Sequence, residues 1–159
     1  MKRVRMTRST LGLTLNDAPS EAHHTIRGAL PADGHALGEV LFLAYLGGPD
    51  QEENDEGEGR AEIARTMGGA YGPFMEAASF VAEDAEGLVG ASLVTRFEGV
   101  PLLAHLVVHP RAQRRGLGSR LAARTIAALG AMSEPTVRLA VHPESPARAL
   151  YTRLGFVEV

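Results

Sequence analysis

The segment 102–129 constrains the fold of this chain more than any other. An apolar run from Leu102 to Val108 predicts a buried strand that ends before Pro110. A basic turn follows, and apolar residues at helical spacing then predict a helix, with one face formed by Leu121, Ala122, Ile126 and Leu129. A strand, a glycine-rich turn and a helix in this order can bind an anion, because the N–H groups of the first helical turn have no internal partner and the helix dipole adds positive charge there.

The residue types in the turn strengthen this prediction. Gly116 and Gly118 have no Cβ, so the backbone can approach a ligand closely. Arg114 and Arg115 carry guanidinium groups suited to a phosphate or pyrophosphate. The alternative is a tight strand-to-helix turn with exposed arginines.

Three phosphate-binding patterns compete for this turn. A P-loop needs Gly-Lys-Ser/Thr, and the only lysine is Lys2, which excludes that class. A dinucleotide fingerprint needs three glycines after the first strand and an acidic residue about 20 residues on, which fits poorly. The third pattern, Gln/Arg-x-x-Gly-x-Gly/Ala, matches residues 113–118.

On two segments the chain resembles the GNAT superfamily of N-acetyltransferases. The first is the strand 103–110 with the Gln-Arg-Arg-Gly-Leu-Gly turn at 113–118. The second is residues 147–156, similar to the family's Ala-x-x-Leu-Tyr-x-x-x-Gly-Phe segment. Motif similarity covers roughly residues 80–158. The resemblance implies an α/β (α+β) fold, a mixed, mostly antiparallel sheet flanked by helices in the order β-α-α-β-β-β-α-β-α-β.

Hydrophobic periodicity gives the expected elements along the chain. A helix starting near Asp33 as N-cap carries the stripe Leu37, Val40, Leu41, Ala44 and Tyr45. A second helix carries Ile63, Met67, Ala70, Tyr71 and Phe74. Strands are expected at 24–30, 79–83, 88–96, 102–108, 136–141 and 156–159, and a short helix at 146–154.

The two ends of the chain raise a question about the sheet. The family usually adds a strand after the Gly-Phe segment, yet this sequence stops at Val159. Because bare edges invite aggregation, we expect a homodimer partner or residues 4–15 to cover that edge. Residues 1–22 are predicted to be an extra strand or a tail, with a turn or linker at 16–21.

Composition bounds the class of protein. We expect residues 1–159 to form a single domain, with enough chain for a core. A net charge of −3 argues against nucleic-acid binding, and no apolar run reaches the roughly 18 residues of a membrane helix. Without cysteines there is no disulfide or thiolate metal site. We expect a cytoplasmic protein that binds no metal, nucleic acid or membrane.

The resemblance implies that acetyl-CoA is the co-substrate. Backbone amides from Gln113 to Ser119, including that of Leu117, are expected to hold its pyrophosphate. The backbone of Leu106, Val107 and Val108 is expected to pair with its pantetheine arm like an added strand. In the family a bulge frees an amide for the thioester oxygen, and our candidate is Val107 or Val108.

Tyr151 matches the family's general acid, since a phenol stays protonated at neutral pH and can donate to a departing thiolate. It also lies on an apolar helical stripe, so the alternative is a buried tyrosine hydrogen-bonded through its hydroxyl. The family often has asparagine where this chain has Glu144. Ser145 is therefore the candidate contact to the pantetheine arm, or else a helix cap.

The general base is the least defined residue. His105 interrupts an apolar strand, and its ordinary pKa suits proton acceptance; the alternative is a structural histidine. Glu83 and Glu98 lie at neighbouring strand ends, and His109 is expected to be a turn residue. His23 and His24 lack a partner pattern for a metal site.

The acceptor is expected to be a primary amine of a small molecule or peptide. An acidic run would attract a cation such as a polyamine, an aminoglycoside, a lysine or an amino terminus, or else it is a solvated loop. Its members are Asp50, Glu52, Glu53, Asp55, Glu56 and Glu58. Five arginines gather near the proposed donor site, where some are expected to meet the 3′-phosphate: Arg111, Arg114, Arg115, Arg120 and Arg124.

Two function classes therefore stand. The first is an acetyl-CoA-dependent N-acetyltransferase, in which the amine attacks the thioester directly. The second is a non-catalytic acyl-CoA-binding regulatory or interaction module that keeps the binding turn without turnover.

Overall fold

Seven strands and four α-helices make up the part of the chain that the computed structural model describes, residues 2–12 and 24–159. The α-helices are α1 (Gly34–Tyr45), α2 (Glu56–Met67), α3 (Leu117–Ala131) and α4 (Ala147–Arg153). The strands are β1 (Val4–Ser9), β2 (Thr25–Gly28), β3 (Phe80–Asp84), β4 (Gly87–Phe97), β5 (Val100–Val108), β6 (Thr136–Val141) and β7 (Val157–Glu158). None of the helices in the described ranges is long and apolar enough to cross a bilayer.

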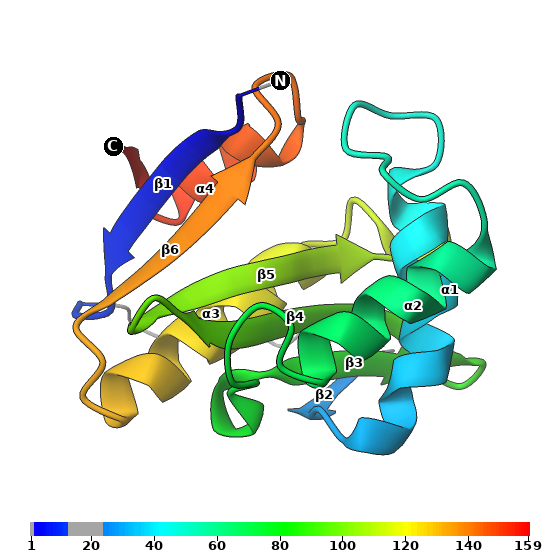
Figure 1. The fold of residues 1–159 in the computed structure, drawn as a ribbon, viewed down its shortest axis with the longest axis horizontal. Coiled ribbons are helices and arrows are strands. Elements are labelled where there is room, and N and C mark those ends of the chain that lie inside the picture. Colours follow the sequence, from blue (N-terminus) through cyan, green and yellow to red (C-terminus); the bar gives the residue numbers. More distant parts are fainter. Residues whose placement is uncertain (1, 13–23) are drawn as a thin grey trace.

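All seven strands join one sheet in the order β2-β3-β4-β5-β6-β1-β7 (Figure 1). Every neighbouring pair is antiparallel except β5 and β6, which run parallel. The predicted mixed, mostly antiparallel sheet flanked by helices is therefore confirmed. The predicted order of elements is also present, with β1 added before it.

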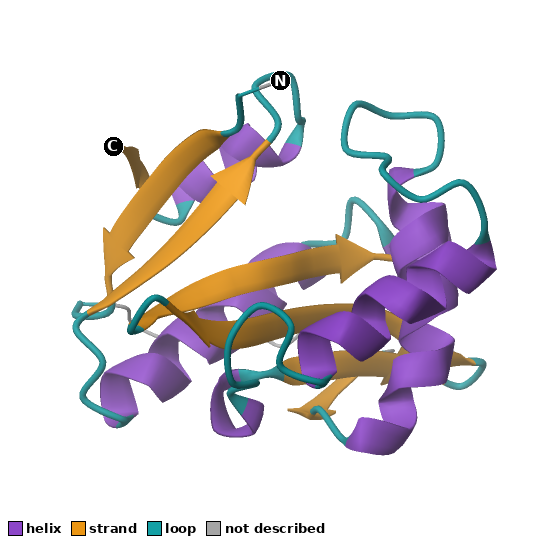
Figure 2. Ribbon diagram, viewed as in Figure 1, coloured by secondary structure: helices purple, strands orange, loops and turns teal. Residues whose placement is uncertain are grey.

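Helices cover both faces of the sheet, α1 and α2 on one and α3 and α4 on the other (Figure 2). Each layer has its own apolar core. On the α3 side Leu121, Ile126 and Phe156 are at most 2% exposed. On the α1 side the core includes Leu37 and Ile63, both fully buried. The predicted apolar stripes thus face the sheet, as burial of apolar surface requires.

The amino-terminal strand β1 pairs with the last strand of the sheet, β7. β1 pairs with β6 along its whole length, from Val4 opposite Val141 to Ser9 opposite Thr136. Its other edge pairs with β7 through Met6 and Thr7. Residues 4–9 therefore supply the partner of the last strand, and the argument for a dimer at that edge no longer applies. The predicted turn at 16–21 and His23 lie outside the described residues.

The bounds of α2 and the partners of the Asp33 side chain differ from expectation. Asp55 caps α2 by accepting the N–H of Glu58 at 2.8 Å, so the helix begins inside the acidic run. It ends at Met67, because Gly68 and Gly69 follow, so the predicted continuation of this helix through Ala70, Tyr71 and Phe74 is wrong. Asp33 lies at the N-cap position of α1 as expected, but its carboxylate caps no amide of this helix and instead accepts the N–H of Leu30 and pairs with Arg27.

Helices α1 and α2 cross at a glycine contact. A Cβ on Gly38 would lie 2.3 Å from Cγ and 2.5 Å from Cα of Arg60. A Cβ on Gly59 would lie 2.2 Å from the carbonyl oxygen of Gly38. The two backbones therefore touch, and only glycine allows this approach. The contact fixes how α2 lies against the sheet.

Substituting Gly38→Ala should lower the free energy of unfolding by about 2 kcal/mol or more, because the helices must separate to accept the methyl group. Gly34→Ala is the matched control in the same helix, since its Cβ would lie 3.4 Å from Met67 Sδ, an ordinary contact. It should change stability by less than about 1 kcal/mol. Urea denaturation compares the two variants, and equal effects would contradict a tight crossing.

Candidate functional site

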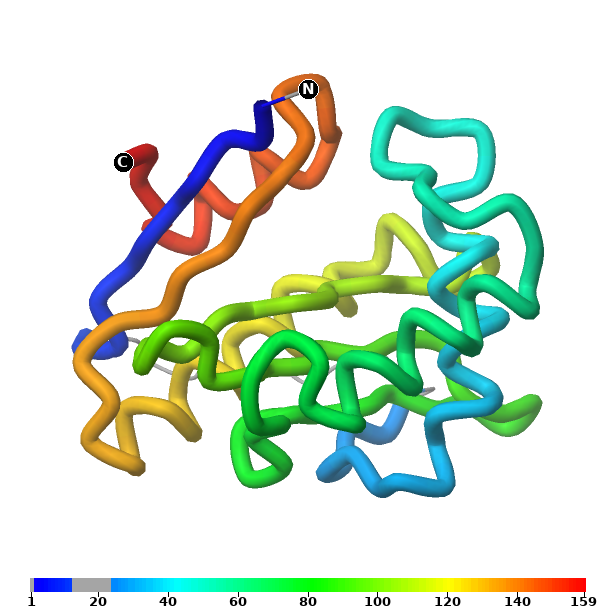
Figure 3. The backbone as a smooth tube through the Cα atoms, in the orientation of Figure 1, coloured from blue at the N-terminus to red at the C-terminus, as the bar shows by residue number. Residues whose placement is uncertain are grey.

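Strands β5 and β6 part soon after they meet. Their one registered pair is Leu102 with Arg138, close to the start of both strands. Beyond it the strands diverge, and the sheet opens into a V (Figure 3). The second half of β5 therefore has a free edge in the middle of the sheet.

The hydrogen-bond pattern identifies which residues present that edge. The N–H of His109 donates to the carbonyl of Val89 on β4, and in an antiparallel ladder bonded pairs alternate. The backbone groups of Val107 therefore face β4, whereas those of Leu106 and Val108 face the opening. Two side chains meet these carbonyls. Tyr45 Oη donates to Leu106 O at 3.3 Å, and Gln113 Nε2 donates to Val108 O at 2.9 Å.

A β-bulge lies earlier in β5 than expected. The register with β4 shifts between Leu93–His105 and Val94–Leu103, which leaves Ala104 as the extra residue. The bulge therefore precedes the segment 106–108 in which we expected it, and of our two candidate amides that of Val107 faces β4. A bulge bends its strand and increases local twist. The bend precedes the free edge and is placed to turn that edge away from β6.

The turn after β5 has the geometry of an anion site. Gly116, at φ 74°, precedes α3 in the left-handed conformation that favours glycine. The first intrahelical bond runs from Arg120 N–H to Gly116 O, so the amides of Leu117, Gly118 and Ser119 precede it. The amide of Gln113 donates to Pro110 O, which removes it from the expected set.

The arginines around this turn separate into two groups. Arg114 and Arg115 are exposed in the turn itself, and Arg120 follows in the first turns of α3. Arg111 pairs with Asp84 at 3.3 Å and with Glu86 at 3.5 Å. Arg124 lies over the ring of Phe80, 5.0 Å from its centroid. Arg111 and Arg124 are thus engaged elsewhere, which leaves Arg114, Arg115 and Arg120 for an anion.

A cavity of about 380 Å³ lies where the strands part, between the α1–α2 layer and α4. It touches β5 from Leu102 to Leu106, so it reaches the free edge. Three of the side chains that line it are the tyrosines Tyr45, Tyr71 and Tyr151, and His105 also lies in its wall.

Tyr151 lines this cavity from α4. The residue is 6% exposed, and its ring packs edge-on against Phe156 with centroids 5.7 Å apart. Among the described residues its hydroxyl has no hydrogen-bond partner, unlike a tyrosine anchored only for structure. Burial raises the pKa of the Tyr151 phenol and Asp50 raises it further, so the group stays protonated at neutral pH.

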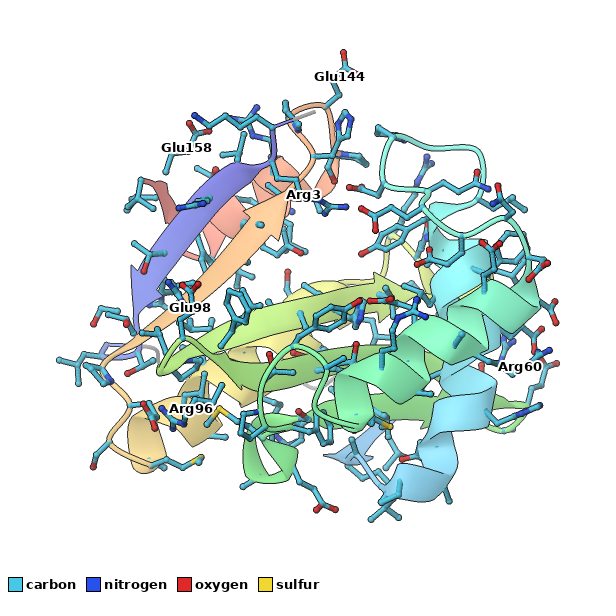
Figure 4. The ribbon with its side chains drawn as sticks, viewed as in Figure 1. Arg3, Arg60, Arg96, Glu98, Glu144 and Glu158 are labelled. Carbon is cyan, nitrogen blue, oxygen red and sulfur yellow. The ribbon has the colours of Figure 1, made fainter. Side chains whose placement is uncertain are left out.

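Ser145 lies one residue before Pro146, the N-cap of α4, and connects this helix to the opposite wall. Its Oγ accepts the N–H of Ala147, the first residue of α4, at 3.2 Å and donates to Asp50 at 2.5 Å. Ser145 is therefore not the N-cap residue, although it does hydrogen-bond the start of the helix. Glu144 is exposed and points away from the cavity (Figure 4).

His105 lies at the centre of a polar cluster on the α2 side. Thr66 Oγ1 donates to the carbonyl of Glu62 at 3.1 Å and lies 2.9 Å from His105 Nε2. Since both the Thr66 hydroxyl and the Glu62 carboxylate lie near Nε2, we assign the imidazole proton to Nε2 and the lone pair to Nδ1. Glu62 Oε1 lies 3.6 Å from Nε2, and Tyr71 donates to Glu62 Oε2 at 2.9 Å. Burial lowers the pKa of His105 to about 4, although Glu62 opposes this, so the ring is neutral and weakly basic.

The other base and metal candidates lie elsewhere. Glu83 pairs with Arg27 on the far strands of the sheet, and Glu98 is an exposed turn residue at φ 52° (Figure 4). His109 accepts the N–H of Arg111 at 3.1 Å, as expected of a turn residue. Among residues 2–12 and 24–159, no three metal-ligating side chains cluster.

The acidic run divides between the cavity and α2. Asp50, Glu52 and Glu53 line the cavity, and Glu52 pairs with Arg3. The remaining three form the start of α2, with Asp55 as its cap and Glu56 and Glu58 in its first turn. Residues 50–55 thus form a loop as expected, but Glu53 is buried in it and the loop ends where α2 begins at Glu56.

Several cavity residues could not be found from the sequence. Tyr45 lies on an apolar stripe, and Glu62, Thr66 and Tyr71 belong to a helix and turn without a motif. The spacing of Glu62 and Thr66, four residues apart, does place them on one helical face. Nothing in the sequence says that this face meets His105.

The depressed pKa of His105 predicts acid sensitivity. Above its ordinary pKa of 6.5 the ring is neutral in both the folded and the unfolded chain and contributes nothing. As pH falls from 6.5 towards 4, only the unfolded chain takes up the proton, so stability should drop by about 3 kcal/mol. Urea denaturation between pH 7 and pH 4 should show this loss in the wild type and a smaller one in His105→Gln. Parallel pH curves for the two proteins would refute it.

Comparison with known proteins places these features in a family. The model of the acetyltransferase (GNAT) domain matches residues 76–158, more than half of the chain. Mycothiol acetyltransferase from Mycobacterium avium is 42% identical over 77 residues, which are 47% of this chain and 23% of that protein. The same enzyme from Mycolicibacterium paratuberculosis gives the same values. The chain thus matches less than a quarter of the length of these curated relatives.

Solved structures share the fold at low sequence identity. A GCN5-related N-acetyltransferase from Sphaerobacter thermophilus has a TM-score of 0.69 at 18% identity, covering 99% of this chain and 49% of that one. The PaiA N-acetyltransferase from Thermoplasma acidophilum, solved in complex with coenzyme A, has a TM-score of 0.63 at 19% identity, covering 83% and 88%. From the family match and the shared fold, this chain belongs to the GNAT acetyltransferase family.

Proposed function

We propose that this protein is an N-acetyltransferase that moves an acetyl group from acetyl-CoA to a primary amine. The observation that carries the proposal is the free edge of β5, which leads directly into the anion-binding turn. The edge offers backbone groups of Leu106 and Val108, and the turn offers amides up to Ser119. An extended pantetheine arm would pair with the free edge of β5 like an added strand, and a pyrophosphate would bind to the amides of the turn.

The cavity at the end of this edge supports direct transfer. In the reaction the amine nitrogen forms a bond to the thioester carbon, the C–S bond breaks, the amine loses a proton and the sulfur gains one. The free amides of Leu106 and Val108 would polarise the carbonyl group of the thioester. Tyr151 is the proton donor in this proposal, since it lines the cavity and its hydroxyl has no hydrogen-bond partner within residues 2–12 and 24–159. Its raised pKa matches a thiolate whose own pKa rises on burial.

The proton of the amine needs a route out of the site. His105 Nδ1 carries the lone pair of a neutral ring, which supports its role as the acceptor. Its low pKa makes it a weak base, so it would relay the proton rather than hold it. Ser145 remains a proposed contact to the pantetheine arm, because it lies in the cavity wall.

Tyr151→Phe should lower kcat by about 10²- to 10⁴-fold, the usual contribution of a proton donor, with the affinity for acetyl-CoA unchanged. The ring and its packing on Phe156 are kept, so folding should be normal. Steady-state kinetics with thiol release as readout measure the effect. An unchanged kcat would exclude Tyr151, and a loss in Tyr45→Phe instead would transfer the role to that phenol.

A charge placed in the turn should weaken cofactor binding. Gly116→Asp puts a carboxylate next to the proposed pyrophosphate site and should raise the Kd for coenzyme A at least about tenfold. Gly116→Asn is the matched control, because asparagine has nearly the same shape and also tolerates the left-handed conformation. Titration calorimetry should show that Gly116→Asn binds coenzyme A much more tightly than Gly116→Asp does. Equal affinities would show that this turn is not the anion site.

A binding module without turnover is the second function class from the sequence. It would bind acetyl-CoA through the same edge and turn, but release no thiol with any amine. Thiol release across a panel of small amines separates the two classes, since only a transferase accelerates release when an acceptor is added.

A further inference from the structure

The cavity wall carries more negative than positive charge. Asp50, Glu52, Glu53 and Glu62 line it. Glu52 pairs with Arg3, and Glu62 pairs with Arg65 at 2.7 Å. Asp50 and Glu53 therefore have no cationic partner among the described residues. We call these four carboxylates the acidic pocket.

Glu53 is a buried carboxylate that no positive side chain among the described residues pairs with. Glu53 is 8% exposed. The side-chain amide of Gln51 donates to the backbone carbonyl of Glu53 and not to its carboxylate. A buried carboxylate is costly unless a cation or several donors compensate it. Burial raises the pKa of Glu53, and the charges of Glu62 and Glu58 raise it further, whereas its own backbone N–H and the charge of Arg65 lower it. A cation arriving in the cavity would relieve this cost.

The acidic pocket adjoins the proposed reaction centre. Asp50 accepts the Ser145 hydroxyl at the start of α4, the helix that carries Tyr151. Asp50 and Tyr151 both line the cavity, and the charge of Asp50 raises the pKa of the Tyr151 phenol. A molecule that filled the cavity would therefore have one end at the free edge of β5 and another at the carboxylates.

We propose that the acceptor is a linear aliphatic diamine or polyamine, one amine being acetylated while the acidic pocket, with Glu53 as its key group, binds a second ammonium. This rests on the proposed acetyl transfer. Tyr45, Tyr71 and Phe97 supply aromatic surface for the methylene spacer and for the cation. At about 380 Å³ the cavity suits a small molecule.

The Arg3–Glu52 ion pair favours a small acceptor over a protein. Arg3 extends from the start of β1 towards the loop after α1, across the mouth of the V (Figure 4). The pair thus joins the two arms of the molecule over the cavity. A narrow flexible amine can pass beside it, whereas a peptide chain would need an open groove.

Three probes of equal length test the proposal: 1,5-diaminopentane, 1-aminopentane and 5-aminopentanoate. At the end away from the reacting amine, 1,5-diaminopentane carries a positive charge, 1-aminopentane carries no charge and 5-aminopentanoate carries a negative charge. The wild type should show kcat/KM at least about tenfold higher for the diamine than for the monoamine, and lowest for the amino acid. Calorimetry without acetyl-CoA should show the same order of affinity.

Glu53→Gln should reduce kcat/KM and affinity for the diamine about tenfold and leave those for 1-aminopentane nearly unchanged. Glu56→Gln is the matched control, since Glu56 belongs to the same acidic run but is exposed and outside the cavity wall. It should keep the preference of the wild type.

The outcomes distinguish the two proposals. Equal kcat/KM for diamine and monoamine, or an equal loss in Glu53→Gln and Glu56→Gln, would overturn the diamine subsite while acetyl transfer stands. Binding of the diamine that depends on Glu53, with no acetylation of any amine, would support the subsite and refute the transferase. No binding and no acetylation of the diamine would overturn this inference.

Discussion

The parting of β5 and β6 is the constraint on which the rest of this site depends. A strand edge inside a sheet normally pairs, since unpaired backbone groups are costly when buried. Here one registered pair holds the strands together, and beyond it Leu106 and Val108 keep backbone groups free. Tyr45 and Gln113 satisfy the carbonyls, which leaves the amides for a ligand. The opening is thus supported by specific side chains, and it creates both a strand edge and a cavity beside it.

The two arms of the V contribute different chemistry. The arm of β6, β1 and α4 carries Tyr151 and ends at Ser145. The layer of α1 and α2 brings carboxylates and places Glu62 and Thr66 against His105 of β5, and this layer depends on the close crossing at Gly38. β1 completes the first arm from the opposite end of the chain, and the Arg3 beside it spans the gap to Glu52. The amino-terminal segment therefore belongs to both the sheet and the site.

Local patterns predicted the elements nearest the donor site, and long-range contacts account for what they missed. β6 is found at the predicted bounds 136–141, and β5, the turn at Gly116 and α3 follow one another in the predicted order. The pattern of acids could not show that Asp55 caps a helix while Glu53 turns into a cavity. The bulge at Ala104 depends on pairing with β4, and no periodicity within β5 reveals it. The partners of His105 likewise depend on how α2 crosses α1.

An amide-resolved NMR titration with coenzyme A tests the central claim most directly. If the free edge and the turn bind the cofactor, the largest shifts should fall on the amides of Leu106 and Val108 and on those of residues 114–119. The amide of Val107 should move less, since it donates towards β4. Shifts concentrated away from both segments, or no shifts at saturating coenzyme A, would contradict the account.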